Sequence, residues 1–208
     1  MLILFTTKHH FMGFDTKDIR NVVLMGHSGC GKTSFAETML FESGAITRMG
    51  SIAEGSTTSD FSSLEKERGN SIFSTLMHVK WKNSKINIID TPGYDDFVGD
   101  VIASMKVADT GVIIINAAHG VEVGTEIIWE YMQAFKTPGI IVMNQMDHEK
   151  ADFDKTLEQA QARFGHKILP FQYPYNQGTG FNSIIDTLRM VLYEFQANGG
   201  KPVKKEIP

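Results

Sequence analysis

Residues 26–33 read Gly-His-Ser-Gly-Cys-Gly-Lys-Thr, which matches the pattern G-x-x-x-x-G-K-[ST]. An apolar run at 21–25 precedes the motif, and a stretch with helical apolar spacing follows it. A glycine-rich loop in this position turns main-chain N–H groups inward to bind phosphate. Lys32 would neutralise the β and γ oxygens of a nucleoside triphosphate, and the Thr33 hydroxyl would ligate Mg²⁺. The expected nucleotide contacts are Gly26, His27, Ser28, Gly29, Cys30, Gly31, Lys32 and Thr33.

The chain has 208 residues, with 20 Lys and Arg against 24 Asp and Glu and a formal net charge of −4. This balance leaves no positive excess for a nucleic-acid backbone, so we expect no direct nucleic-acid binding by this chain. The single cysteine excludes an internal disulfide. The longest apolar runs, such as 112–115, are strand-sized and far shorter than the roughly 20 residues of a membrane helix. We therefore expect a cytoplasmic protein without a membrane span.

Short β-branched runs alternate with amphipathic stretches along the chain, which predicts an α/β fold with a mostly parallel sheet and helices on both faces. A turn at 82–84 predicts an antiparallel hairpin, and the polar stretch 45–70 predicts a long loop. After about Gly165 the pattern changes to that of a small β-rich or α+β element, followed by a linker-like tail. The further strands are expected at 72–81, 85–89, 111–115 and 139–143, and the further helices at 98–108, 127–135 and 153–164.

A second motif, Asp90-Thr91-Pro92-Gly93, follows the apolar strand at 85–89. Parallel α/β sheets bind ligands at the carboxyl ends of their strands. Asp90 there can hold Mg²⁺ through water, and the Gly93 N–H can contact a γ-phosphate. Alone, these four residues could be a strand-ending turn. The phosphate loop upstream makes the nucleotide interpretation the stronger one.

A third motif, Asn144-Gln145-Met146-Asp147, also follows an apolar strand. A carboxylate at Asp147 can accept from both the N1–H and the N2 amine of guanine, whereas adenine offers no such pair. The motif therefore predicts guanine, with Asn144, Gln145 and Asp147 as nucleotide-binding residues. Such a tetrapeptide is common by chance, so its weight comes from its order and spacing after the first two motifs.

Together the three motifs resemble the G domain of translational GTPases of the elongation factor G type. The resemblance covers nearly all of residues 18–198, including the segment Glu67-Arg68-Gly69-Asn70-Ser71-Ile72 and the stretch DTPGYDDF at 90–97. It implies a loose segment at 1–17, a G domain at 18–165, an inserted subdomain at 166–198 and a linker-like tail at 199–208. The family's fifth nucleotide-binding motif would follow the insertion and is absent here, so the chain resembles the N-terminal part of a longer protein with an incomplete guanine pocket.

Three positions depart from the family pattern. Gly29 stands where the family has Asp, a ligand for a monovalent cation near the phosphates. Ser71 replaces Thr and still offers a hydroxyl to Mg²⁺, so the metal ligands implied are Thr33, Ser71 and Asp90. Tyr94 replaces the His that positions the attacking water, a role that a neutral phenol fills poorly. The catalytic residues implied are Tyr94, Lys32 and Gly93, with hydrolysis slowed by the tyrosine.

The resemblance implies a GTP-driven conformational switch acting in translation. Its cofactors would be GTP or GDP with Mg²⁺, its partner the ribosome, and its moving part the segment 51–71. A non-hydrolysing GTP-binding factor that associates with or protects the ribosome is the alternative. A third interpretation, an ATP-using P-loop enzyme such as a small-molecule kinase, leaves the motif at 144–147 without a role.

Overall fold

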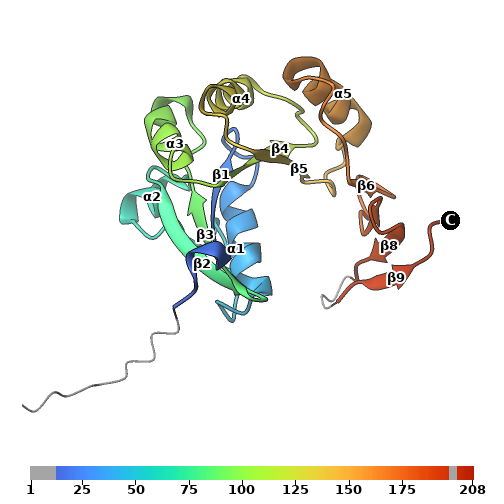
Figure 1. The fold of residues 1–208 in the computed structure, drawn as a ribbon, viewed down its shortest axis with the longest axis horizontal. Coiled ribbons are helices and arrows are strands. Elements are labelled where there is room, and N and C mark those ends of the chain that lie inside the picture. The colour runs from blue at the N-terminus through green and yellow to red at the C-terminus, as the bar shows by residue number, and fades with distance from the viewer. Residues whose placement is uncertain (1–12, 197–200) are drawn as a thin grey trace, which may run out of the picture.

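Five strands form the central sheet of the computed structural model, which describes residues 13–196 and 201–208. The sheet order is β2-β3-β1-β4-β5, and the pairs β3–β1, β1–β4 and β4–β5 are parallel (Figure 1). The parallel strands carry β-branched runs because both faces of the sheet are covered. The strands are β1 (Ile19–Met25), β2 (Thr75–Trp81), β3 (Ser84–Asp90), β4 (Thr110–Asn116) and β5 (Gly139–Asn144).

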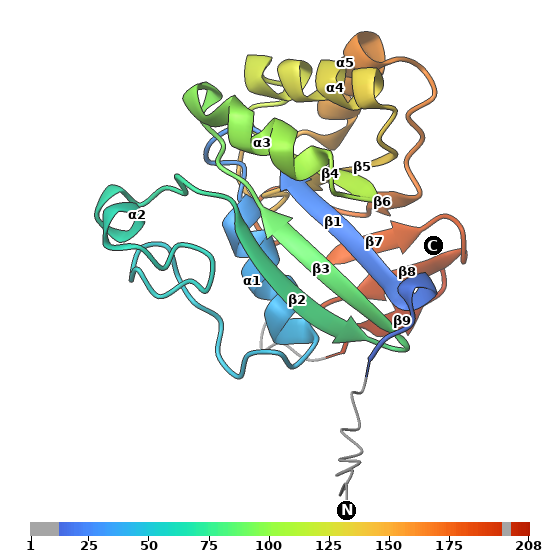
Figure 2. The same ribbon diagram turned by 60° about the vertical axis from the view of Figure 1, so that its left-hand side comes forward.

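Helices cover both faces of this sheet, as Figure 2 shows. On one face, α1 packs with Leu24 and Ile114; on the other, α4 and α5 pack with Met25 and Ile113. Neighbouring residues of one strand thus enter opposite core clusters, because side chains alternate across a sheet. This arrangement confirms the α/β fold with helices on both faces. The helices are α1 (Lys32–Glu42), α3 (Val98–Met105), α4 (Val123–Phe135) and α5 (Phe153–Phe164), with short 3₁₀ turns η1 (Thr16–Asp18) and η2 (Asp95–Phe97).

The hairpin expected around residue 82 is present, since β2 and β3 pair antiparallel from Trp81↔Ser84 to Thr75↔Asp90. Lys82 adopts a left-handed φ of 52° in the turn. The first strand is shorter than expected, because residues 72–74 do not pair and instead lead out of the polar segment before them. Asp90 therefore lies at the carboxyl end of β3, next to the carboxyl ends of β1 and β4.

The polar stretch 45–70 is not the continuous loop that its composition predicted. It contains a helix, α2 (Ser63–Arg68), which begins with a capping box in which the Ser62 hydroxyl accepts from Glu65 N–H and the Glu65 carboxylate accepts from Ser62 N–H. Gly69, at φ 65°, ends the helix. The spacing Ser62-x-x-Glu65 is a recognised helix-start signal, so this element could have been found from the sequence.

A second, smaller sheet follows α5. Its antiparallel strands are β6 (Gln172–Pro174), β7 (Ser183–Asp186), β8 (Val191–Glu194) and β9 (Val203–Lys205). Strand β9 corrects the expectation of a linker at 199–208, because residues 203–205 pair with β8 and Lys205 bonds to Glu194 at 2.6 Å. Tyr173 and Phe181 connect this sheet to Phe153 at the start of α5.

The N-terminal segment and the possibility of a membrane-spanning helix were both addressed by the sequence. Of the loose stretch 1–17, residues 1–12 lie outside the described residues, and η1 occupies the end of the remainder. Across the described part of the chain, none of the helices combines the length and the apolar character that crossing a bilayer requires.

Candidate nucleotide-binding site

The glycine-rich loop joins the end of β1 to the start of α1, and its glycines are required by geometry. Gly26 has φ 146°, and a Cβ there would lie 2.3 Å from Ile114 O. Gly31, at φ 94°, is the N-cap of α1, and its Cβ would lie 2.4 Å from Asn144 Nδ2. L side chains rarely adopt such φ values and these neighbours are close, so both positions need glycine. The first helical turn then directs its free N–H groups toward the loop.

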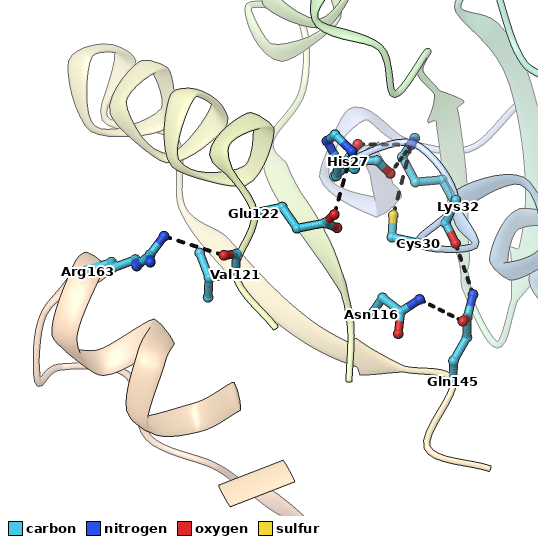
Figure 3. A network of polar contacts seen from close by, with 10 residues as sticks. His27, Cys30, Lys32, Asn116, Val121, Glu122, Gln145 and Arg163 are labelled. Atoms are coloured by element: carbon cyan, nitrogen blue, oxygen red, sulfur yellow. Dashed lines mark hydrogen bonds and ion pairs between the residues drawn. The ribbon is translucent and has the colours of Figure 1, made fainter. Parts of the chain in front are cut away.

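Lys32 lies inside the loop, as Figure 3 shows. Its ammonium donates to Gly26 O at 2.9 Å and to His27 O at 3.1 Å, and its side chain is 6% exposed. The second motif lies next to this lysine at Gly93. A Cβ atom at Gly93 would lie only 2.3 Å from Lys32 Nζ. The structure thus places the loop lysine and the DTPG glycine in contact. Cys30 is buried beside them, and burial raises the pKa of its thiol despite the nearby ammonium.

The three expected metal ligands lie together at the mouth of the loop. Thr33 Oγ1 donates to Asp90 Oδ2 at 2.8 Å and lies 3.1 Å from Ser71 Oγ. Ser59 Oγ also donates to Asp90 Oδ2, at 2.7 Å. Burial raises the pKa of Asp90, although the two hydroxyl donors and Lys32 oppose this.

This donor set fits Mg²⁺. Asp90 Oδ1 is buried and has no hydrogen-bond partner among the described residues, so it can accept from a metal-bound water. Within residues 13–196 and 201–208, no three His, Cys, Asp or Glu side chains gather tightly enough to hold a metal by themselves. One carboxylate with hydroxyls is the sparse oxygen set that Mg²⁺ uses when phosphates and waters complete its shell.

Asp60 is a site residue that the sequence reasoning missed. It is 4% exposed and lines a cavity of about 180 Å³ together with Thr33 and Ser71. Its Oδ1 is buried and unpaired within the described structure. Burial raises the pKa of this carboxyl, against a hydrogen bond from Ser71. The sequence could not assign Asp60 to the site, because it is one acidic residue in a polar segment. It reaches the cavity only when that segment folds over the phosphate loop.

The third motif reaches the site in two different ways. Asn144 Nδ2 donates to Cys30 O at 2.8 Å, and Gln145 Nε2 donates to Gly29 O at 3.0 Å. Both amides therefore hold the phosphate loop from the end of β5. Asp147 is exposed and lines a separate, larger cavity of about 1190 Å³ that follows the open edge of β5 toward α5 and β6.

Tyr94 lies at the opening of the phosphate cavity and is 45% exposed. Ser28 and Gly29 of the glycine-rich loop line the same cavity. On the other side of the loop, His27 Nε2 lies 3.6 Å from Glu122 Oε1, an ion pair when the imidazole is protonated (Figure 3).

A glycine-rich loop between a strand and a helix, with a lysine inside it and a hydroxyl–carboxylate pair at its mouth, defines a P-loop nucleotide-binding domain. Comparison with known families makes the assignment more specific. The family described as "Elongation factor Tu GTP binding domain" matches residues 17–202, and the chain belongs to this family.

Comparison with individual proteins shows which members of this family the chain is similar to. The chain is 37% identical over 195 residues to elongation factor G of Mycoplasma genitalium and 38% identical over 192 residues to that of Mycoplasma pneumoniae. These matches cover 93% and 92% of this chain but 28% of each relative. A crystal structure of a protein from Thermus thermophilus superposes with a TM-score of 0.85 at 30% identity, covering 91% of this chain and 28% of that one. The chain is an elongation factor G-like GTP-binding domain, as the sequence resemblance predicted.

Proposed function

We propose that this chain binds and hydrolyses GTP as the switch domain of an elongation factor G-like protein that acts on the ribosome in the cytoplasm. The two relatives named elongation factor G match more than nine-tenths of the chain. Because the chain spans about 28% of their length, the remaining contacts with a ribosome would come from parts of such a protein that this chain does not represent.

The observation that carries the proposal is the 2.8 Å hydrogen bond between Thr33 Oγ1 and Asp90 Oδ2. It joins the phosphate loop to the DTPG motif, and these two motifs supply side chains that would hold Mg²⁺. Bound there, Mg²⁺ would neutralise the phosphate oxygens. Thr33 and Ser71 would ligate the ion, and the carboxylates of Asp90 and Asp60 would orient its waters.

The remaining residues of the loop would bind the phosphates directly. Lys32 would leave its carbonyl partners for the β and γ oxygens, and the N–H groups of residues 26–33 would surround the β-phosphate. The Gly93 N–H would donate to the γ-phosphate from the opposite side. Asp147 would select guanine by accepting two hydrogen bonds from its Watson–Crick edge.

Hydrolysis would be slow because of Tyr94. Its phenol lies at the cavity opening, where the family's histidine positions the attacking water. A neutral phenol stabilises the charge that develops during phosphoryl transfer less than an imidazole does. A positioned proton-transfer group contributes about 10² to 10⁴ in rate, so the bound GTP state would persist.

The proposed division is a G domain at 18–165, which carries the whole phosphate site, and an inserted subdomain at 166–198. The four-stranded sheet after α5 supports a separate second unit, because its strands pair only with one another in the described structure, and β9 (Val203–Lys205) extends that unit beyond residue 198.

The experiment is nucleotide titration of the full-length protein with a fluorescent GTP analogue and Mg²⁺. Saturable binding that excess GTP reverses and excess ATP does not is expected. Single-turnover hydrolysis is then followed with and without ribosomes, where a slow rate that ribosomes accelerate is the expected result. Binding without hydrolysis in both conditions would leave a GTP-binding factor without GTPase activity, and the lack of any saturable signal at millimolar GTP would refute the proposal.

A further inference from the structure

Asn116, the last residue of β4, begins a chain of amide hydrogen bonds that ends on the phosphate loop (Figure 3). Asn116 Nδ2 donates to Gln145 Oε1 at 2.8 Å, and Gln145 Nε2 donates to Gly29 O at 3.0 Å. Asn116 and Asn144 are paired in register at the ends of β4 and β5, which places Gln145 beside Asn116. This series of hydrogen bonds therefore runs from the end of the central sheet to the loop that would surround the phosphates.

The direction of every amide in this chain is determined. Asn116 Oδ1 accepts from Ala118 N–H at 2.9 Å, so its Nδ2 must point toward Gln145. That donor requires an acceptor, so Gln145 presents Oε1 to Asn116 and Nε2 to Gly29 O. Asn116 is 5% exposed, which keeps water from substituting for the two hydrogen bonds that its own side chain makes.

Gln145 also adopts an unfavourable backbone conformation, with a left-handed φ of 58°. A residue other than glycine keeps such a φ only where its surroundings hold it. The bonds to Asn116 and Gly29 are two such restraints, and the strain indicates that the amide's position is needed there.

We propose that Asn116 is a positioning residue of the nucleotide site: through Gln145 it sets the position of Gly29, and thereby the phosphate loop, for binding. Nothing in the three sequence motifs assigns a role to Asn116, which belongs to none of them. The inference rests on the proposed GTP binding, since it explains how that loop is held ready for phosphate.

A carboxylate at position 116 would reverse the direction of these hydrogen bonds. Asn116→Asp keeps the bond from Ala118 N–H but turns a second oxygen toward Gln145 Oε1. Gln145 must then rotate its amide, which directs Oε1 at Gly29 O and removes the hydrogen bond to the loop. Two acceptors then face each other at Gly29 O, so the hydrogen bond from Gln145 to the loop is lost and a repulsive contact replaces it.

Gln145→Lys alone is also unfavourable, because its ammonium faces the Nδ2 donor of Asn116. The double variant Asn116→Asp with Gln145→Lys restores compatibility: the new carboxylate accepts from Ala118 N–H and from the ammonium, which still donates to Gly29 O. Two harmful substitutions should therefore compensate each other, which independent sites do not do.

The test measures GTP dissociation constants and hydrogen exchange of residues 27–31 in the nucleotide-free, full-length protein. Each single variant should weaken GTP binding by about tenfold or more and speed exchange in the loop. The double variant should return within about threefold of wild type, instead of the roughly hundredfold loss that additive effects predict.

Asn87→Asp is the matched control. Asn87 Nδ2 likewise donates to a neighbouring amide oxygen, that of Asn21 at 2.8 Å, but the two residues lie in β3 and β1, away from the loop. It should leave GTP affinity and loop exchange unchanged. If Asn116→Asp alone does not fold, the double variant is compared with Gln145→Lys. The double variant must then bind GTP more tightly and exchange more slowly in the loop than Gln145→Lys.

The inference is overturned if the single variants leave affinity and loop exchange within about twofold of wild type, or if the double variant is no better than either single. If the wild-type protein binds no GTP, the proposed function fails, while hydrogen exchange in the nucleotide-free proteins still decides whether Asn116 positions the loop.

Discussion

Thr33 and Asp90, 57 positions apart in the chain, are joined by a 2.8 Å hydrogen bond between Oγ1 and Oδ2. One residue lies in the first turn of α1 and the other ends β3, so the bond joins the elements next to the phosphate loop and the DTPG motif. The carboxylate it involves is fully buried and keeps one oxygen unpaired within the described part of the molecule. This relationship supports the first prediction.

Asp90→Asn should stabilise the nucleotide-free protein while weakening its response to magnesium. Burial raises the pKa of Asp90, so the ionised carboxylate is unfavourable in the folded state at neutral pH. An amide removes this cost and can still accept from Thr33 and Ser59. We expect a higher melting temperature without ligand and a loss of about tenfold or more in the Mg²⁺-dependent part of GTP affinity. A variant that melts lower and binds GTP normally would contradict this account.

Gly31→Ala should disrupt the site more than Gly29→Ala. Both residues have positive φ, 94° and 79°, which costs an alanine about 1 kcal/mol at each position. The Gly31 Cβ would also meet Asn144 Nδ2 at 2.4 Å, whereas a Cβ at Gly29 meets no described atom within 4 Å. Losing the bond from Asn144 to Cys30 O adds about 1–3 kcal/mol. Denaturant unfolding of the two variants measures the difference, and equal losses would contradict it.

Glu37→Ala should loosen the segment that precedes α2. The Glu37 carboxylate, 1% exposed within α1, accepts from the main-chain N–H groups of Gly50 and Thr58. Removing it leaves both donors without a partner, at a cost of about 1–3 kcal/mol. Limited proteolysis should cut residues 48–58 several times faster than in wild type. Glu42→Ala, at the exposed end of the same helix, is the control and should leave cleavage unchanged.

Glu65→Gln should lower stability at neutral pH, and the deficit should shrink in acid. Burial alone would raise the pKa of Glu65, but hydrogen bonds from Ile72, Ser62 and Phe73 lower it below its ordinary value. The ionised carboxylate therefore contributes stability above the unfolded pKa of 4.5, and this contribution is lost as pH falls through the folded pKa. Urea unfolding from about pH 7 to about pH 3.5 should show a difference of about 1.5–3 kcal/mol that declines below about pH 4.5. A constant difference across this range would argue against the assignment.

Tyr94→His in the full-length protein should raise ribosome-stimulated GTP turnover by about tenfold or more, because an imidazole can position the attacking water. GTP affinity should change little, since Tyr94 lies at the opening of the cavity and is 45% exposed. Tyr175→His, at an exposed position in the smaller sheet region, is the control. Unchanged turnover would mean that other residues replace the histidine's role.

The sequence alone predicted the three motifs and most elements of the central sheet and its helices. The loop at 26–33, the strands around it and the helix after it follow from residue types a few positions apart, because hydrophobic period, glycine and helix-start signals are local. The same holds for the hairpin at Lys82. The polar composition of residues 45–70 predicted a loop where α2 lies. Ser62 and Glu65 nevertheless form a local helix-start signal for α2.

Only the tertiary structure decided which distant groups meet. It brought Ser59 from the polar segment onto Asp90 and Asp60 into the cavity beside Thr33. It also showed that Gln145 holds the loop at Gly29 and is itself held by Asn116. It also placed Val203–Lys205 in a sheet where composition had indicated a linker. These outcomes depend on strand order, register and burial, which arise only when segments far apart in the chain pack together.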